Sequence, residues 1–382
     1  MTVFIVVTHL LGTGHLARAL VLARAFTAAG HKVTIASGGM PVPHLDTNGL
    51  NFLQLAPLRS DGTNFSRLLD RAGSDVTEVY LTQRRNALCS SLERTSPDIV
   101  ITELFPFGRR SLSGEFEALL NAAKQLSKLP LICASVRDIL APPSKPAKTD
   151  ATREMIARYY DAILVHSDPD ITPLELSWPV TDDLAEKIHY TGFVTPAPSA
   201  PHAQSLGRNE IIVSAGGGGV GHTLYETAVS AARTTPEFQW RILVGGSDAN
   251  DQCEKLQAKA PQNVIVEPAR RDFRNMLHHA QASVSMCGYN TALDILQAGT
   301  PAVFIPFDAG SEVEQSLRAG ALAALDGVEV LASRDLSPAT LNNAIAALLK
   351  QPSRPPRTAG LDGAERSVDT LKRLYAGTQH AG

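Results

Sequence analysis

The chain has 382 residues, of which 44% are hydrophobic and 19% charged, and its formal net charge is −3. This length predicts two domains of roughly 150–200 residues each, and the composition is typical of a soluble globular protein. Because lysine and arginine are scattered, no basic surface is predicted and we expect no nucleic-acid partner. The four cysteines show no metal-binding spacing, and no run approaches the roughly 18 apolar residues of a transmembrane helix. We therefore expect a cytoplasmic protein with reduced thiols, and the sequence leaves peripheral contact with the inner face of the membrane open.

The first 40 residues predict a strand–helix–strand unit. The β-branched apolar run at 3–7 is typical of a strand buried on both faces of a parallel sheet, and it lacks the flanks of a signal peptide. A loop with two glycines follows at 11–14, and the helical pattern from His15 ends at Gly30. Residues 33–35 begin the next strand. Parallel strands need such crossovers, so the pattern indicates a doubly wound α/β sheet.

The alternation continues and then begins a second time. Strands are predicted at 98–102, 129–135, 161–166, 188–194, 210–214, 240–244, 264–266, 282–286 and 302–305. A proline-rich segment at 196–209 separates the two series, and we interpret it as a linker. We predict an amino-terminal domain over 1–195, a carboxy-terminal domain over 210–355, and a helix within 356–382 that packs back on the first domain. Ligands are expected in a cleft between the two sheets, outside the carboxyl ends of their strands.

The strongest local signal is a glycine-rich loop at 214–221, between a strand and a helix. Glycine lets the backbone approach a ligand closely, and the free N–H groups of a helix start favour an anion such as phosphate. No Gly-Lys-Ser/Thr of a P-loop follows, and no GxGxxG motif stands in its usual place after the first strand. We therefore predict that the loop binds a diphosphate rather than forming a plain turn. The predicted contacts are Gly216, Gly217, Gly218, Gly219 and Gly221.

A second strand–turn–helix junction lies at 285–291. Asn290 or Thr291 either caps the following helix or, together with Gly288 and the N–H groups of the helix start, faces the same diphosphate. Asp294 lies one helical turn later. Its carboxylate is either a contact to ribose hydroxyls or part of a solvated helix face.

Polar residues also follow the last predicted strand. Glu314, Gln315 and Arg318 are candidates for contacts to sugar hydroxyls, and a charged helix start is the alternative. Arg270 and Arg318 are candidates for adding positive charge beside the diphosphate.

His15 and Glu103 are the candidate catalytic pair. His15 stands where the first loop meets its helix, next to Gly14, which is a further candidate for diphosphate contact. Glu103 ends another strand of the same sheet. Because parallel strands end on one edge, the carboxylate is expected to orient an imidazole that takes a proton near neutral pH. The alternatives are that His15 is a cap or packing residue, or that His9, earlier in the same loop, is the base.

Two other features receive a structural interpretation. Asp168-Pro169-Asp170 matches the DxD signature of metal-dependent nucleotide-sugar enzymes, but a turn with aspartate side-chain hydrogen bonds is favoured. His278 and His279 are neighbours on a helix, so their side chains point in different directions. We predict no metal site.

Several segments together resemble family 28 glycosyltransferases, the family of the lipid II N-acetylglucosaminyltransferase. THLLGTGHLARALVLARAF, residues 8–26, resembles the family's amino-terminal GTGGH loop. SMCGYNTALDILQAGTPAVFIPF, residues 285–307, and EVEQSLRAGALAAL, residues 312–325, resemble its donor-binding region. The motifs ELFPFGRR, YTGF, GYNT and EQ-x2-RA make the chain most similar to a branch of predicted bacterial glycosyltransferases. The resemblance implies the GT-B fold, which is two Rossmann-like domains facing across a cleft.

The resemblance also implies roles for individual residues. The glycines of 216–221 would hold the donor diphosphate, and Asp294 replaces a glutamate that binds the nucleotide ribose in the relatives. Gln315 aligns with a glutamine that contacts the donor sugar, and His15 aligns with the histidine of the amino-terminal loop. The acceptor-side loops of the lipid II enzyme are not recognisable, so lipid II chemistry is not implied.

The implied activity is inverting, metal-independent transfer of a sugar from a nucleoside-diphosphate sugar, expected to be UDP-linked, to an acceptor hydroxyl. His15, oriented by Glu103, would remove the proton, and no cofactor is needed beyond the donor substrate. Nucleotide-sugar hydrolysis and a non-enzymatic sugar-nucleotide sensor are the alternatives, and a nicotinamide dehydrogenase is disfavoured because the first turn lacks GxGxxG. The nucleobase, the sugar, the acceptor (saccharide, lipid-linked or small molecule) and the oligomeric state are not indicated.

Overall fold

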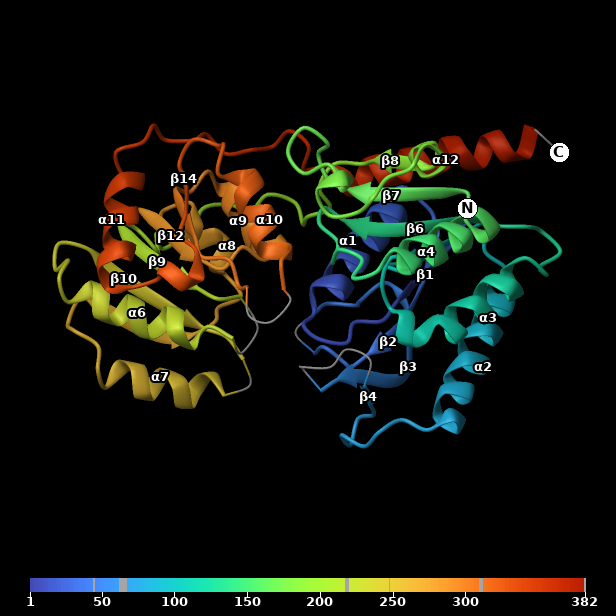
Figure 1. Cartoon of the computed structure of the whole chain (residues 1–382), viewed down its shortest axis with the longest axis horizontal. Helices are drawn as coiled ribbons and strands as arrows, with labels where there is room; N and C mark the ends of the chain where they lie inside the picture. The colour runs from blue at the N-terminus through green and yellow to red at the C-terminus, as the bar shows by residue number, and fades with distance from the viewer. Residues whose placement is uncertain (44, 62–66, 217–219, 247, 309–311, 381–382) are drawn as a thin grey trace. The chain divides into compact units, whose positions relative to one another are not determined.

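The computed structural model describes residues 1–43, 45–61, 67–216, 220–246, 248–308 and 312–380. The chain forms two compact units (Figure 1). One consists of Met1–Pro196 with Gly360–Gly382, and the other of Ala197–Ala359.

The first unit contains an eight-stranded sheet in the order β4-β3-β2-β1-β5-β6-β7-β8. The strands are β1 (Thr2–Val7), β2 (Lys32–Gly39), β3 (Asn51–Ser60), β4 (Leu68–Leu69), β5 (Ile99–Glu103), β6 (Leu131–Arg137), β7 (Ala162–His166) and β8 (Ile188–Tyr190). Neighbouring strands are parallel, except that β3 and β4 are antiparallel. The sequence pattern did not predict β3 and β4.

Alternate residues of the central strand β1 enter two different cores, as its continuous apolar run requires. Val3, Ile5 and Val7 pack with α1 and α12, whereas Phe4 and Val6 face the core that α2, α3 and α4 cover. The helices are α1 (Gly14–Ala28), α2 (Glu78–Thr95), α3 (Ser113–Ala123), α4 (Pro146–Tyr159), α5 (Asp182–Ala185) and α12 (Gly363–His380), with 3₁₀ turns at Arg110–Leu112 and Leu174–Leu176.

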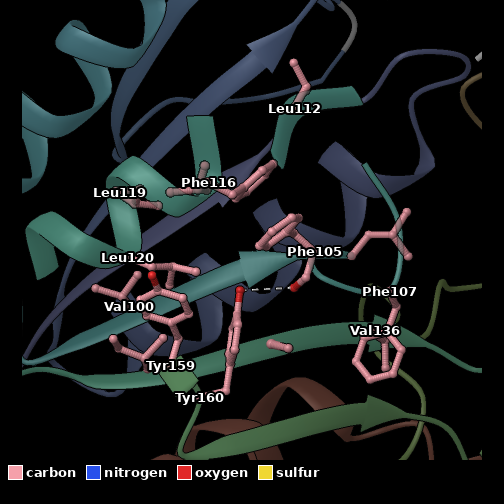
Figure 2. Close-up of a cluster of buried hydrophobic side chains, with 14 of the residues drawn as sticks. Val100, Phe105, Phe107, Leu112, Phe116, Leu119, Leu120, Val136, Tyr159 and Tyr160 are labelled. Carbon is pink, nitrogen blue, oxygen red and sulfur yellow. Dashed lines mark hydrogen bonds between the residues drawn. The ribbon is translucent and has the colours of Figure 1, made fainter. Parts of the chain in front are cut away.

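The second of these cores anchors the loop that follows β5. Phe105 stacks on Phe116 of α3 with ring centroids 4.4 Å apart, and Phe107 meets Trp178 edge-on. Figure 2 shows the Tyr160 hydroxyl pointing at the carbonyl oxygen of Phe105. The loop that directly follows Glu103 at the end of β5 is therefore anchored by packed aromatic side chains.

The terminal helix α12 belongs to the first unit. Val368 and Leu371 enter the core beside α1, and the Tyr375 hydroxyl donates to Asp98 at 2.6 Å. An isolated bridge pairs Val194 with Asp362 at the point where the chain returns.

The second unit contains a six-stranded parallel sheet in the order β11-β10-β9-β12-β13-β14. Its strands are β9 (Glu210–Ser214), β10 (Gln239–Val244), β11 (Val264–Pro268), β12 (Ala282–Ser285), β13 (Ala302–Phe304) and β14 (Val328–Val330). Its helices are α6 (His222–Ala232), α7 (Ala249–Gln257), α8 (Phe273–Leu277), α9 (Tyr289–Ala298), α10 (Glu314–Leu322) and α11 (Pro338–Leu348), with a 3₁₀ turn at Ser333–Asp335. A core of β9, β10 and β12 packs under α6, α7 and α11.

The proline-rich segment, interpreted above as a linker, packs on the second unit. Arg274 donates to the carbonyl oxygen of Ala197, and Asn275 donates to that of Ala200. His202 pairs with Asp272 at 3.1 Å. These contacts to α8 and the turn before it fix residues 197–202, so this stretch is a structured part of the unit rather than a free connector.

Candidate active site

Each sheet reverses its strand order at one place. In the first unit the reversal lies between β1 and β5, and in the second between β9 and β12. In open α/β sheets, ligands bind outside the carboxyl ends of the strands at such a switch point. The predicted catalytic pair follows β1 and β5, and the two predicted diphosphate loops follow β9 and β12. Each group of candidates thus lies at the switch point of its own sheet.

The structure brings His15 and Glu103 into contact. His15 Nδ1 lies 3.0 Å from Glu103 Oε1, and both side chains are buried. Arg18, one helical turn after His15, donates to the same carboxylate oxygen, and the Ser135 hydroxyl donates to Oε2 at 2.7 Å. Gly14, the first residue of α1, stands directly before His15.

The surroundings fix the protonation of this pair. Burial opposes ionisation of Glu103, but the charge of Arg18 and the hydrogen bonds from His15 and Ser135 lower its pKa to about 2. Burial lowers the pKa of His15 well below 6.5, and the charges of Arg109 and Arg137 lower it further, against the hydrogen bond to Glu103. At neutral pH the carboxylate only accepts hydrogen bonds, so the neutral imidazole carries its proton on Nδ1. Its Nε2 then has a lone pair, which is the arrangement of a general base.

Sequence reasoning missed Arg18 and Ser135. Arg18 is a charged residue on the otherwise apolar face of the first helix, three positions after His15, and that position was the available signal. Ser135 is the register partner of Glu103 on β6, a relation that only the sheet pairing reveals.

His9, the competing candidate base, lies in a different environment. It is buried, and its Nδ1 has no hydrogen-bond partner among the residues the structure describes. A Cβ on Gly39 would lie 2.4 Å from this nitrogen, so the imidazole packs against β2. The paired carboxylate therefore favours His15 as the base.

In the second unit, Gly217, Gly218 and Gly219 lie outside the described residues. Gly216 has a φ of +80°, and a Cβ placed on it would lie 3.9 Å from Thr291 Oγ1, so the ends of the two loops approach each other. A Cβ on Gly221 would lie 2.4 Å from Ala215 Cβ and 2.5 Å from the Tyr225 ring. Packing alone therefore requires glycine at 221.

The helices that follow these loops begin without side-chain caps. The N-cap residues of α1, α6 and α9 are Thr13, Gly221 and Gly288, and none accepts a capping hydrogen bond through a side chain. Asn290 is exposed and Thr291 half-buried in the first turn of α9. Uncapped N–H groups at the start of a helix are suited to an anion.

Asp294 is ion-paired within its own unit. Its Oδ1 accepts from Arg274 Nε at 2.7 Å, and Arg274 also donates to Gln297 of α9. Burial raises the pKa of Asp294 to about 6, against the opposing charge and hydrogen bond of Arg274.

The three candidate sugar contacts on α10 occupy different positions. Arg318 and Glu314 are buried and pair at 3.2 Å, and Arg318 donates to the carbonyl oxygen of Cys287 at 2.9 Å. This ion pair therefore holds the turn before α9. Gln315 is half-buried, and its Oε1 accepts from the backbone N–H of Phe307 at 3.1 Å.

Arg270 lies in the loop between β11 and α8. Its guanidinium makes two hydrogen bonds of 2.8 Å to Asp272 and lies 3.2 Å from Glu267. Both carboxylates lie against its charge, and the hydrogen bonds that Arg270 donates to Asp272 raise the pKa of the guanidinium.

The structure gives no metal-ligating arrangement to the two features interpreted structurally above. Asp168 Oδ1 accepts from the backbone N–H of Asp170 at 3.1 Å, which is the hydrogen bond of an Asx turn. His278 faces Ser199, and His279 faces the carbonyl oxygen of His202. Over the described part of the chain, no three His, Cys, Asp or Glu side chains form a group that could hold a metal ion. None of the helices described is long and apolar enough to cross a bilayer.

Known proteins provide an independent comparison. A UDP-N-acetylglucosamine–N-acetylmuramyl-(pentapeptide) pyrophosphoryl-undecaprenol N-acetylglucosamine transferase of Phenylobacterium zucineum is 26% identical over 196 residues, which cover 48% of this chain and 52% of that protein. The chain thus spans about half the length of the curated relative it matches. Among solved structures, MurG of Acinetobacter baumannii superposes with a TM-score of 0.63 at 15% identity, covering 98% of this chain and 100% of that one. UGT2 of Phytolacca americana gives a TM-score of 0.63 at 12% identity, with coverages of 98% and 94%.

Residues 212–374 match the family model described as the glycosyltransferase family 28 C-terminal domain. The chain has the GT-B fold, and its carboxy-terminal part is similar to family 28 glycosyltransferases. The predicted fold class, two doubly wound α/β domains of this type, is thereby confirmed. The segment that matches the family model runs from β9 into α12 and includes both predicted diphosphate loops.

Proposed function

We propose that this chain is a glycosyltransferase that moves a sugar from a nucleoside-diphosphate sugar to an acceptor hydroxyl. The observation that carries the proposal is the buried His15–Glu103 pair at the switch point of the first sheet, in a chain whose residues 212–374 match the family 28 C-terminal domain. The donor is proposed to be UDP-linked, because the P. zucineum relative is named for UDP-N-acetylglucosamine and the P. americana structure contains UDP-2fluoro-glucose.

In the proposed reaction, His15 Nε2 takes the proton of the acceptor hydroxyl as the hydroxyl attacks the anomeric carbon. Glu103 stabilises the imidazolium that forms, and attack from the face opposite the diphosphate inverts the anomeric centre. N–H groups at the starts of α6 and α9 stabilise the departing diphosphate, so neither a metal nor a cofactor is required.

The second unit supplies the donor contacts in this proposal. The glycine loop and the α9 start, with Asn290 and Thr291, bind the diphosphate, Asp294 binds the ribose, and Gln315 binds the sugar. The burial of Glu314 and Arg318 favours a role in holding the turn at Cys287 rather than direct sugar contact. Arg270, which two carboxylates hold, is assigned to the electrostatics of the site at longer range.

Relatives named as transferases favour transfer over hydrolysis or sensing. We infer a cytoplasmic protein, in keeping with a donor that carries a nucleotide. A saccharide, a lipid-linked compound and a small molecule are all compatible acceptors, and a lipid-linked acceptor would place the protein at the inner face of the membrane.

The proposal is tested by screening nucleoside-diphosphate sugars with the full chain in a thermal-shift assay. A ligand at 100 times its Kd adds about 2.7 kcal/mol to the stability of the unit that binds it. The stabilising donor is then incubated with panels of acceptors, and NMR of the product reads the anomeric configuration. Transfer is supported if one donor stabilises the protein and the wild type forms a product with inverted anomeric configuration that His15→Gln does not form. Release of free sugar alone would indicate a hydrolase. Donor binding without turnover on any acceptor would indicate a sensor. A screen in which no nucleoside-diphosphate sugar stabilises the protein would overturn the proposal.

A further inference from the structure

A chain of buried polar side chains continues behind Glu103, away from His15. Ser135 Oγ lies 2.7 Å from Glu103 Oε2 and 2.9 Å from His166 Nε2, and His166 Nδ1 lies 2.8 Å from Thr191 Oγ1. We refer to Ser135, His166 and Thr191 as the polar chain behind Glu103. At most 2% of each of these residues is exposed.

The topology of the sheet assembles this chain. Glu103 ends β5, Ser135 is its register partner on β6, His166 ends β7, and Thr191 directly follows β8. Consecutive parallel strands therefore present one polar residue each at the carboxyl edge. Polar groups buried at this depth are unfavourable unless each is hydrogen-bonded, and here each contacts the next.

The direction of every hydrogen bond follows from the charge of Glu103. An ionised carboxylate only accepts, so the single hydroxyl proton of Ser135 goes to Oε2, and Ser135 must accept from His166 Nε2–H. Burial and the charge of Arg18 lower the pKa of His166 to about 3, so its imidazole is neutral. With the proton on Nε2, Nδ1 accepts from the Thr191 hydroxyl. All three hydrogen bonds therefore point towards Glu103, and hydrogen bonds in such a series polarise one another.

We propose that Ser135 and His166 are positioning residues that fix Glu103 Oε2, so that Oε1 stays aligned on His15 Nδ1. The assignment rests on the proposed function for His15 and Glu103. Without the Ser135 hydroxyl, Oε2 would lose this hydrogen-bond donor in a buried site, and the contacts of Oε1 to Arg18 and His15 would orient the carboxylate less precisely. The effect should appear in the chemical step and not in donor binding, because the polar chain lies in the first unit.

The kinetic test compares Ser135→Ala with Ser37→Ala, which removes a fully buried hydroxyl of the same sheet whose Oγ has no hydrogen-bond partner among the described residues. A hydrogen bond to a charged group is worth enough to change a rate by about 10- to 100-fold. We expect Ser135→Ala to lower kcat by this factor with the KM for the donor unchanged, and Ser37→Ala to match wild type. His166→Gln, whose amide can donate to Ser135, should retain more activity than His166→Leu.

Because the polar chain acts through Glu103, adding Ser135→Ala to Glu103→Gln should slow the enzyme no further. If Ser135→Ala lowers kcat by the same factor in the wild-type and Glu103→Gln backgrounds, the proposed coupling through Glu103 is wrong.

A second readout needs no substrate. In ¹⁵N-histidine NMR spectra of the full chain, His15 should be protonated on Nδ1 and His166 on Nε2, and Ser135→Ala should shift the His15 Nδ1 resonance. An unchanged His15 resonance would overturn the positioning role even if no acceptor is known. Absence of turnover in the wild type with every donor would overturn the proposed function instead, so the two failures can be told apart.

Discussion

His15 Nδ1 lies 3.0 Å from Glu103 Oε1, although 88 residues separate them in the chain. The contact arises because β1 and β5 are parallel neighbours, with Val6 opposite Thr102, so the two following segments leave the sheet at the same edge. Arg18 and Ser135 hold the carboxylate from two further directions. These contacts position the pair as the proposed general base and its orienting carboxylate require.

Replacing the imidazole should abolish most turnover without affecting the donor. A positioned general base contributes about 10²–10⁴-fold, so His15→Gln should lower kcat by that factor with donor Kd unchanged. Glu103→Gln should act in the same direction by a smaller factor. Steady-state kinetics and calorimetric titration of the donor measure the two quantities separately.

His9→Gln is the matched control for this experiment, because His9 is buried in the same loop without a carboxylate partner in the described structure. It should retain turnover close to wild type. An inactive His9→Gln beside an active His15→Gln would move the base to His9.

The sequence predicted most of the sheet that carries this site, because the central strands are continuous apolar runs. It did not predict β3, which mixes exposed and buried residues and contains Pro57. Proline inside an apolar run argues against a strand, and β3 tolerates it where its pairing with β2 is irregular, between Ser37 and Gly39. The strand could be recognised only once its neighbour was in place.

The sequence likewise predicted some residues of the candidate site and missed others. Spacing and the family resemblance suggested His15 and Glu103, because His15 stands where the loop after β1 meets α1 and Glu103 ends β5. The partners Arg18 and Ser135 were missed, since a side chain that completes a network across two strands leaves no local pattern. Conversely, the sequence suggested Arg318 as a contact to the donor sugar or a charge beside the diphosphate, whereas in the structure it is buried and donates to the carbonyl oxygen of Cys287.

The first unit should become less stable as the pH is lowered, because His166 is buried in its neutral form. The folded protein holds the pKa of this imidazole at about 3, against 6.5 in the unfolded chain. Between these values the unfolded state binds the extra proton, so the free energy of unfolding decreases as pH falls below 6.5, by up to about 1.4 kcal/mol per pH unit. His166→Gln removes this contribution, so its free energy of unfolding should decrease less steeply between pH 7 and pH 5. Urea denaturation at several pH values measures how the free energy of unfolding depends on pH in the wild type and in His166→Gln. An equal pH dependence in both proteins would show that His166 is not a buried neutral group.

Gly288 tests the diphosphate site by steric blocking. Its φ is −66°, and a Cβ there meets no atom within 4 Å, so Gly288→Val should fold normally. The side chain would stand at the start of α9 and keep a diphosphate from its N–H groups. Losing one or two charge-assisted hydrogen bonds should raise the Kd of a nucleoside diphosphate by about 10- to 100-fold. Gly320→Val on α10, whose Cβ also meets open space, is the control, and equal affinity in the two variants would remove the α9 start from the site.

Asp294→Asn should weaken binding of UDP by about 10-fold or more and leave binding of pyrophosphate nearly unchanged, because only UDP carries the ribose. The substitution also breaks the ion pair with Arg274. Arg274→Gln breaks the same ion pair and keeps the carboxylate, so it should retain the preference for UDP. Calorimetric titration with both ligands separates the cases, and equal losses for UDP and pyrophosphate in Asp294→Asn would exclude a ribose contact.

Turnover should survive EDTA. The uncapped N–H groups at the starts of α6 and α9 are fixed before the reaction, and preorganised donors of this kind stabilise a departing diphosphate as a divalent ion would. Asp168, the first carboxylate of the DxD-like segment, belongs to the first unit, where it closes a turn on the backbone of Asp170. Chelation should therefore leave kcat within a few-fold, and Asp168→Asn combined with Asp170→Asn should be equally mild. The assay is run after dialysis against EDTA, with magnesium and manganese added back separately. A chelated enzyme that loses activity and regains it with either ion would assign metal chemistry to the reaction, and loss of that rescue in the double variant would place the ion at the Asp-Pro-Asp turn.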